Sequence, residues 1–179
     1  MKINSPLALL GGLSPAEFMV QYWQKKPLLV RNAIGLQALS SLTSRSTLFE
    51  LASREDVPSR LVAFKKSKWT MNHGPHEKLP SLKTPDWTLL VQGVDLLDAN
   101  VYGLLQQFRF VPDARLDDAM FSFAAHGGGV GPHFDSYDVF LLQTSGARRW
   151  RIGKQKDLSL VEGAPLKVLS DFQPTKEYF

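Results

Sequence analysis

The sequence predicts an α+β fold in which short helices lead into the antiparallel strands of a barrel or jelly roll. Helical patterns dominate the first half of the chain, whereas the residues after Gly127 have the character of β-structure. A chain of 179 residues with 44% apolar and 21% charged residues has the composition of an ordinary globular domain. It is long enough to bury a substantial core as one domain.

The first expected helix starts at Ser14. Serine caps a helix through its side-chain oxygen, Pro15 suits the first helical turn, and Glu17 completes a capping box. This amphipathic helix should run to about Gln24 and end before Pro27. The sequence pattern predicts further short helices at residues 36–42, 46–53 and 100–108.

Short apolar runs predict the strands. The expected strands cover residues 28–30, 60–64, 87–92, 120–125, 139–142, 149–152 and 166–169. The run at 139–142 is apolar at every position, which is typical of a strand covered on both faces. Residues 65–86 are rich in Lys, Pro, Gly and His, so we expect an exposed loop with one strand at its start.

Composition excludes several classes of protein. The sequence has no cysteine, so it holds neither a disulfide framework nor a zinc-finger site, and a metal would need imidazole and oxygen ligands. No apolar run approaches the length of a membrane helix, and we expect a cytoplasmic protein without membrane contact. The net charge is +4, with short basic clusters at 25–26, 65–68 and 148–151. We interpret these clusters mainly as solvated surface and predict no direct nucleic-acid binding.

The most informative segment is GGGVGPHFDSYDVFLLQ at 127–143, in which a glycine-rich turn precedes His133 and Asp135. In a strand, residues i and i+2 point to the same face, so this imidazole and this carboxylate could bind one metal ion together. One carboxylate with two imidazoles is the ligand set of non-haem Fe(II) oxygenases. By the same parity Tyr137 could face the site, with packing an equal alternative, whereas Asp138 should point away.

The other histidines are weaker candidates for a further ligand. His126 lies on the glycine-rich turn and could complete a site, but an exposed loop histidine is the simpler interpretation. His73 and His76 have a spacing that suits a metal. They lie in a polar loop, however, and we interpret them as ordinary loop residues.

Three stretches of the sequence resemble the cupin-type JmjC ribosomal oxygenases, in particular the bacterial branch of ribosomal-protein arginine hydroxylases. They are YWQKKPLLVR at 22–31, the segment at 127–143, and GARRWRIG at 146–153. A bare H-x-D motif is a weak signal, but one embedded in these neighbouring motifs is highly specific. The resemblance runs over nearly the whole chain.

The resemblance implies a helical N-terminal portion packed on a double-stranded β-helix, the cupin jelly roll. It implies that His133 and Asp135 bind Fe(II) and that Arg148 holds the distal carboxylate of the cosubstrate 2-oxoglutarate. A guanidinium suits that role because its planar fork pairs with a carboxylate through two hydrogen bonds. The resemblance further implies hydroxylation of an arginine side chain of a ribosomal protein, and a homodimer as one expected assembly.

Members of this family place a third iron ligand, a histidine, well beyond the H-x-D motif, and no histidine follows His133 in this sequence. We therefore expect the chain to be the N-terminal half of such a protein, with one domain at residues 1–179. In this interpretation, residues 1–119 are a mixed helical lead-in. Residues 120–179 carry the first strands of an incomplete barrel.

Two alternatives remain open. A catalytically inactive, truncated cupin could serve as a binding or dimerisation module, because the open sheet edge left by missing strands can pair with another chain. A small-molecule cupin, such as an isomerase or dioxygenase, is the other, although the helical N-terminal portion and the ARRW segment count against it. Missing strands would also expose apolar faces, so we expect association or low solubility.

Overall fold

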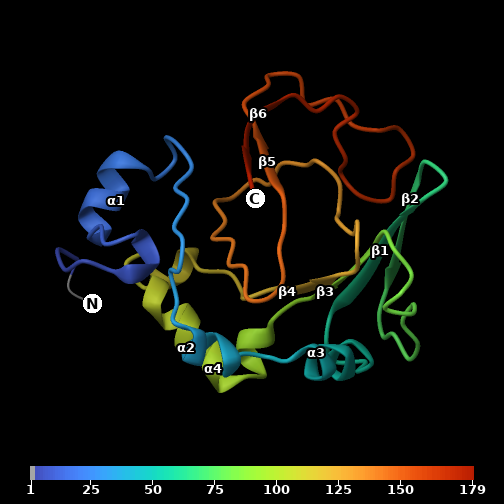
Figure 1. The fold of residues 1–179 in the computed structure, drawn as a ribbon, viewed down its shortest axis with the longest axis horizontal. Coiled ribbons are helices and arrows are strands. Elements are labelled where there is room, and N and C mark those ends of the chain that lie inside the picture. Colours follow the sequence, from blue (N-terminus) through green and yellow to red (C-terminus); the bar gives the residue numbers. More distant parts are fainter. Residues whose placement is uncertain (1–2) are drawn as a thin grey trace. The chain divides into compact units, whose positions relative to one another are not determined.

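The computed structural model describes residues 3–179, whose elements are drawn in Figure 1. The chain divides into two compact units. The first consists of the residues up to Leu48 together with Gln92–Met120, and the second consists of Phe49–Val91 and Phe121–Phe179. No helix in residues 3–179 is both long enough and apolar enough to cross a membrane.

Short helices make up the first unit. They are η1 (Ala8–Leu10), α1 (Pro15–Gln21), α2 (Leu36–Ser40), η2 (Val94–Leu96), α4 (Ala99–Leu105), η3 (Gln106–Phe108) and η4 (Asp113–Arg115). Helix α3 (Arg45–Ala52) contains the residue at which the second unit begins. The helices expected at 36–42, 46–53 and 100–108 are confirmed, the last of them as α4 followed by a turn of 3-10 helix.

Helix α1 begins with the predicted capping box. Ser14 Oγ accepts a hydrogen bond from the Glu17 backbone N–H at 3.2 Å, and Glu17 Oε2 accepts one from the Ser14 backbone N–H at 2.8 Å. The helix ends at Gln21, earlier than the expected Gln24, and Gln24 itself has a left-handed φ of 55° that no helix can contain. On the buried side of the helix, the ring of Phe18 packs edge-to-face with the rings of Trp23 and Phe110. The ring centres are 6.0 Å apart in both pairs.

The stretch Gln92–Met120 is inserted between two strands of the second unit in chain order, and hydrogen bonds join its two ends. The Gly93 N–H donates to Asp118 Oδ2 at 2.7 Å, and the Ala119 N–H donates to Asp95 Oδ1 at 2.8 Å. Each end of the insertion therefore supplies a carboxylate that accepts from the backbone of the other end.

A four-stranded antiparallel sheet of order β2-β1-β3-β4 lies at the centre of the second unit. Its strands are β1 (Ser59–Lys65), β2 (Lys68–His73), β3 (Trp87–Val91) and β4 (Phe121–Ala124), and Figure 1 shows β1 and β2 as a hairpin. A second sheet pairs β5 (Trp150–Gly153) with β6 (Pro174–Tyr178). These positions confirm the strands expected at 60–64, 87–92, 120–125 and 149–152, and the strand expected at the start of 65–86.

The core of the second unit forms around β3, which is buried at every position. The ring of Trp87 lies 5.3 Å from that of Phe123 on β4, and the ring of Phe49 on α3 lies 5.2 Å from Phe123. Buried aromatic pairs at these distances add to the stabilisation that comes from removing apolar surface from water. The sheet is therefore anchored to α3 by side chains that are far apart in the sequence.

Two of the predicted strands are wrong. Residues 28–30 and 139–142 lie outside every strand that the structure describes. In the first run Leu29 is 46% exposed, and in the second Leu141 is 63% exposed. An apolar run becomes a strand only where a neighbouring strand satisfies its backbone groups, and neither run pairs with such a strand among residues 3–179.

Two further differences concern the last part of the chain. The strand expected at 166–169 is reduced to a single bridge between Leu160 and Leu169. Strand β6 was not expected, because PTKEY is mostly polar and carries no apolar alternation. Its position is set by pairing with β5, in which Arg151 faces Glu177.

We expect Ser14→Ala to lower the free energy of unfolding by about 1 kcal/mol, because the helix loses the cap that satisfies the Glu17 N–H. Chemical denaturation followed by circular dichroism measures this change. Ser40→Ala is the matched control, because Ser40 lies at the end of α2 and its hydroxyl only donates to the Gln37 carbonyl. The control should change stability by less than about 0.5 kcal/mol. If both substitutions lower the stability equally, the loss in Ser14→Ala does not come from the capping box.

Candidate metal centre

His133 and Asp135 lie beside each other, although the backbone that carries them is not a strand. Residues 125–149 form turns and irregular backbone. His133 Nε2 lies 3.6 Å from Asp135 Oδ2, and each side chain is 39% exposed. The structure thus brings the imidazole and the carboxylate together, whereas the strand from which we derived their proximity is absent.

The ring of His133 is oriented by its own loop. Its Nδ1 lies 2.9 Å from the carbonyl oxygen of Gly131. A carbonyl oxygen can only accept, so Nδ1 carries the ring proton, and the neutral ring then has a free lone pair on Nε2. Metal-binding histidines are commonly held in this way, by a hydrogen bond from the ring nitrogen that does not touch the metal.

The two donors suit a metal ion in both chemistry and spacing. Bonds of about 2.0–2.2 Å from nitrogen and oxygen to a first-row metal bring neighbouring ligand atoms to about 3 Å from each other. The observed 3.6 Å between His133 Nε2 and Asp135 Oδ2 needs only a small side-chain adjustment to reach that separation. Among residues 3–179, however, no group of three or more His, Asp and Glu side chains could hold a metal ion. His133 and Asp135 are therefore two donors of the kinds that a facial triad combines, and a triad needs three.

The other histidines do not supply the third ligand within the described part of the chain. His126 is exposed on the turn after β4, and His73 is exposed at the end of β2. His76 lies outside every helix and strand, as expected of a loop residue, but its side chain is buried. Burial lowers its pKa, and the nearby charge of His73 lowers it further, so His76 is neutral at physiological pH.

The glycine-rich turn lies so close to the sheet that it excludes side chains at two positions. A Cβ atom on Gly127 would collide with the carboxylate of Asp86, and one on Gly128 would collide with the backbone carbonyl of Trp87. The Gly128 N–H donates to the Ala125 carbonyl at 2.8 Å. Close backbone approach therefore explains these glycines, and it fixes the path of the chain towards His133.

The two arginines of the ARRW segment have different surroundings. Arg149 forms an ion pair with Glu177, Nη1 to Oε1 at 2.7 Å, and its guanidinium lies 5.5 Å from the centre of the Phe179 ring. Arg148 is partly buried, lies 5.6 Å from the centre of the Trp150 ring, and has its pKa lowered by burial. No carboxylate of the described residues pairs with Arg148. Of the two, it is the guanidinium that is available to bind an added carboxylate.

Comparison with known proteins finds relatives for most of the chain. Residues 103–179 match the model of the JmjC domain. The chain is 42% identical over 139 residues to the ribosomal protein uL16 3-hydroxylase of Escherichia coli, and 40% identical over 149 residues to a probable ribosomal oxygenase of Haemophilus influenzae. These alignments cover 78% and 82% of this chain.

The fold agrees as well. The X-ray structure of E. coli ycfD superposes on 93% of the chain with a TM-score of 0.83 and 36% identity. A structure of the same ribosomal oxygenase in complex with cobalt and 2-oxoglutarate gives a TM-score of 0.77. The chain is a relative of the JmjC ribosomal oxygenases. Its helices and antiparallel sheet are those of a JmjC, cupin-like fold.

The chain covers only part of the length of these relatives. It spans 37% of the length of the uL16 3-hydroxylase, 36% of the H. influenzae protein and 44% of the ycfD chain. This partial coverage fits our interpretation of the chain as the N-terminal half of a ribosomal oxygenase.

The remaining residue that we singled out in the JmjC segment is Tyr137. Its side chain is 67% exposed on the irregular backbone that follows Asp135. Because no strand forms here, the parity from which we expected Tyr137 to face the site does not apply. The ring is therefore accessible from solvent rather than packed in the core.

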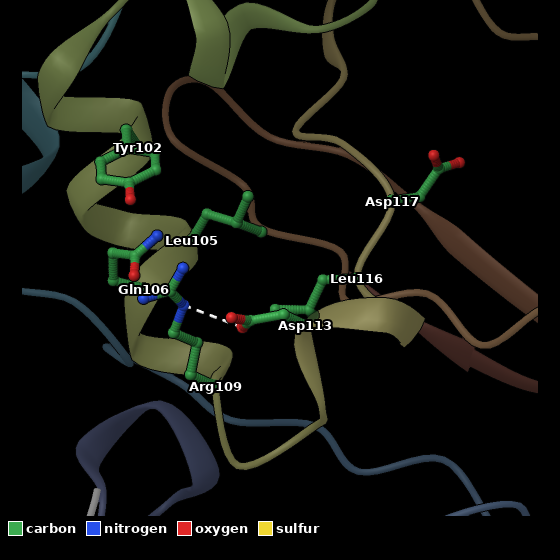
Figure 2. Close-up of a pocket in the computed structure, with 7 residues that line it drawn as sticks. All are labelled: Tyr102, Leu105, Gln106, Arg109, Asp113, Leu116 and Asp117. Atoms are coloured by element: carbon green, nitrogen blue, oxygen red, sulfur yellow. Dashed lines mark ion pairs between the residues drawn. The ribbon is translucent and has the colours of Figure 1, made fainter.

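Sequence reasoning did not anticipate a surface pocket in the first unit, shown in Figure 2. Side chains from α4, η3, η4 and the residues that follow η3 and η4 line it: Tyr102, Leu105, Gln106, Arg109, Asp113, Leu116 and Asp117. Arg109 Nε and Asp113 Oδ1 form an ion pair across it at 2.9 Å. The pocket contains none of His133, Asp135 and Arg148.

We expect Gly128→Ala to destabilise the protein by about 1–3 kcal/mol, because the added methyl group meets fixed backbone of Trp87. The neighbouring Gly129→Ala is the matched control, because its Cβ would meet no atom within 4 Å and its backbone needs no glycine-only angle. The control should stay within about 0.5 kcal/mol of the unsubstituted chain. Thermal unfolding of both variants checks this, and a similar loss in both would contradict the close approach of the turn.

Proposed function

We propose that this chain is part of an Fe(II)- and 2-oxoglutarate-dependent protein hydroxylase that acts on an arginine side chain of a ribosomal protein. One observation carries the proposal. His133 and Asp135 lie 3.6 Å apart within the segment that matches the JmjC domain. Two relatives of this chain are named for ribosomal protein hydroxylation or as a ribosomal oxygenase, and one solved relative is a complex with cobalt and 2-oxoglutarate.

His133 and Asp135 would hold the iron. His133 Nε2, on the ring whose Nδ1 lies against the Gly131 carbonyl, and the exposed carboxylate of Asp135 are suitable donors, and a third donor must come from outside the groups described in residues 3–179. Bound Fe(II) would supply the activation of dioxygen, coupled to decarboxylation of 2-oxoglutarate, that hydroxylation of a C–H bond requires. The role of the chain's own residues is to orient the ligands and the cosubstrate.

Arg148 would bind the distal carboxylate of 2-oxoglutarate. Its guanidinium is partly withdrawn from water, lies against Trp150, and has no carboxylate partner in the described part of the chain. A charge-assisted pair is stronger in such surroundings than at an open surface, because solvent screens it less. Arg149 cannot take this role without giving up its pair with Glu177.

The substrate class follows from the relatives. The name of the E. coli relative identifies ribosomal protein uL16 as its substrate, and we propose a ribosomal protein as substrate here. Tyr137 is exposed close to Asp135 in sequence and would contact the substrate or cosubstrate. We also propose that residues 120–179, which contain β4, β5 and β6, carry the first strands of a double-stranded β-helix.

A second candidate function is a catalytically inactive module that binds or dimerises. The apolar residues Val139, Phe140, Leu141 and Leu142 are between 38% and 63% exposed, and such a surface favours association with another chain. The two ligands described also fall short of a full triad. Consumption of 2-oxoglutarate distinguishes an oxygenase from such a module.

Anaerobic titration of Fe(II) and 2-oxoglutarate into the 179-residue chain tests the proposal. We expect the visible charge-transfer absorption of the chelated complex to appear, and His133→Ala and Asp135→Ala to abolish it. Arg148→Ala should weaken 2-oxoglutarate binding about tenfold or more while changing metal affinity little, because it removes a charge-assisted pair.

His73→Ala is the control for the loss of a histidine, because His73 is exposed on β2 and belongs to no candidate centre among the described residues. It should leave the absorption unchanged. A folded chain that gives no absorption, or absorption that survives both His133→Ala and Asp135→Ala, would overturn the ligand assignment. The first of these outcomes would favour the inactive binding module.

A further inference from the structure

We infer that Trp69 is a positioning residue for the candidate metal centre, acting through Gly131 on the ring of His133. This inference rests on the proposed role of His133 as a metal ligand. Trp69 lies on β2 and faces Phe64 of β1, with ring centres 4.6 Å apart. It is far from the H-x-D segment in sequence, and neither motif nor periodicity relates the two.

Gly131 is enclosed by side chains. A Cβ atom on Gly131 would lie 2.9 Å from Trp69 Cζ2 and 3.0 and 3.1 Å from the two methyl carbons of Val168. Val168 is 3% exposed, so it has little room to move. Gly131 also has a φ of +78°, which residues with a side chain rarely adopt. Trp69 and Val168 therefore hold the backbone at Gly131 in one place.

This position determines the orientation of the metal ligand. The Gly131 carbonyl accepts from His133 Nδ1 at 2.9 Å, and the next carbonyl, that of Pro132, accepts from the Leu169 N–H at 2.8 Å. A shift of Gly131 would move the acceptor away from Nδ1 and release the ring to change tautomer or to rotate. Groups that orient metal-binding histidines typically contribute a factor of about 10–100 to metal affinity.

The test compares Trp69→Leu with Phe64→Leu. Both variants remove the Phe64–Trp69 ring pair, but only Trp69→Leu removes the indole that packs on Gly131. In the chain with ¹⁵N-labelled histidine and without metal, NMR reports which ring nitrogen of His133 carries the proton. We expect the Nδ1–H form in the unsubstituted chain and in Phe64→Leu, and a mixture of tautomers in Trp69→Leu.

Cobalt(II) titration provides the second measurement. The dissociation constant should rise about tenfold or more in Trp69→Leu and remain within about twofold in Phe64→Leu. Val168→Ala, on the other side of Gly131, should act in the same direction and serves if Trp69→Leu does not fold. Equal changes in the two strand variants, or an unchanged His133 tautomer in Trp69→Leu, would overturn the positioning role. If His133 keeps the Nδ1–H form in the unsubstituted chain and loses it in Trp69→Leu, but neither chain binds cobalt, the proposed function is overturned and the positioning of the ring by Trp69 is not.

From observations that do not involve the candidate metal centre, we propose that the tip of the β1–β2 hairpin binds the phosphate backbone of RNA. The tip consists of Lys65, Lys66, Ser67 and Lys68, all of them exposed. Lys65 and Lys68 are direct cross-strand partners, an arrangement of like charges that destabilises a hairpin. Lys66 and Ser67 have φ values of 49° and 60°, where glycine or asparagine is preferred.

No ion pair with a described residue compensates these lysines. Locally unfavourable choices that nothing in the fold offsets tend to mark sites of function. Ammonium groups on flexible stems suit phosphates spaced along a chain, and the partly exposed ring of Phe64 beside them offers a surface for stacking. If the substrate is a ribosomal protein, RNA is the polyanion that accompanies it. The sequence alone gives no reason to separate this cluster from the other basic clusters, and it led us to expect no nucleic-acid binding.

Fluorescence anisotropy of a labelled RNA hairpin with the full chain tests this binding surface. The triple substitution K65Q, K66Q and K68Q should reduce affinity about tenfold. It should also reduce the slope of log affinity against log salt by about 0.7–0.9 for each phosphate that the variant no longer neutralises. The matched control is K154Q, K156Q and K167Q, which removes the same charge from three exposed lysines of the same unit and should change affinity by less than about twofold. Equal effects of the two triple substitutions, absence of binding, or equally tight binding of polyglutamate would overturn the proposal. None of these outcomes depends on iron.

Discussion

The packing of Trp69 and Val168 around Gly131 is the interaction on which the candidate metal centre depends. A residue without a side chain is needed there, because the two side chains leave no space for one. The carbonyl that this packing fixes accepts a hydrogen bond from Nδ1 of His133, and Nε2 of the same ring lies 3.6 Å from Asp135 Oδ2. The irregular backbone around the H-x-D motif is thus held by the sheet and by the residues before β6 rather than by strand pairing.

Local sequence patterns predicted most of the helices and strands. They failed where pairing with residues far away in the sequence decides whether a segment forms a strand. Strand β3 was predictable because WTLLV consists mostly of apolar residues and of types that favour strands, and it is buried throughout. The run at 139–142 is apolar as well but pairs with no described strand, and its side chains remain exposed. Strand β6 could not be predicted from its mostly polar sequence, because pairing with β5 alone defines it.

In the candidate site, too, some features could be predicted from the sequence and others only from the structure. The spacing of His133 and Asp135 predicted that their side chains would approach each other, and they do so without the strand that we assumed. The motif identified Arg148, but only the structure distinguishes it from Arg149 by the Glu177 ion pair. Trp69 could not be found from sequence, since its packing on Gly131 joins segments with no shared pattern. The described residues contain no group of three candidate metal ligands, so no third ligand can be assigned from them.

The insertion between β3 and β4 has a consequence for the kinetics of folding. Val91 and Phe121 are cross-strand partners, so the sheet cannot acquire β4 until the ends of the intervening segment Gln92–Met120 meet. Closing such a loop costs chain entropy before the strand pairing offsets it, which slows the step. The carboxylates of Asp95 and Asp118 bond across the ends of this segment, and if they form early they shorten the effective loop. Two carboxylates outside the sheet would then influence the rate at which it is completed more than its final stability.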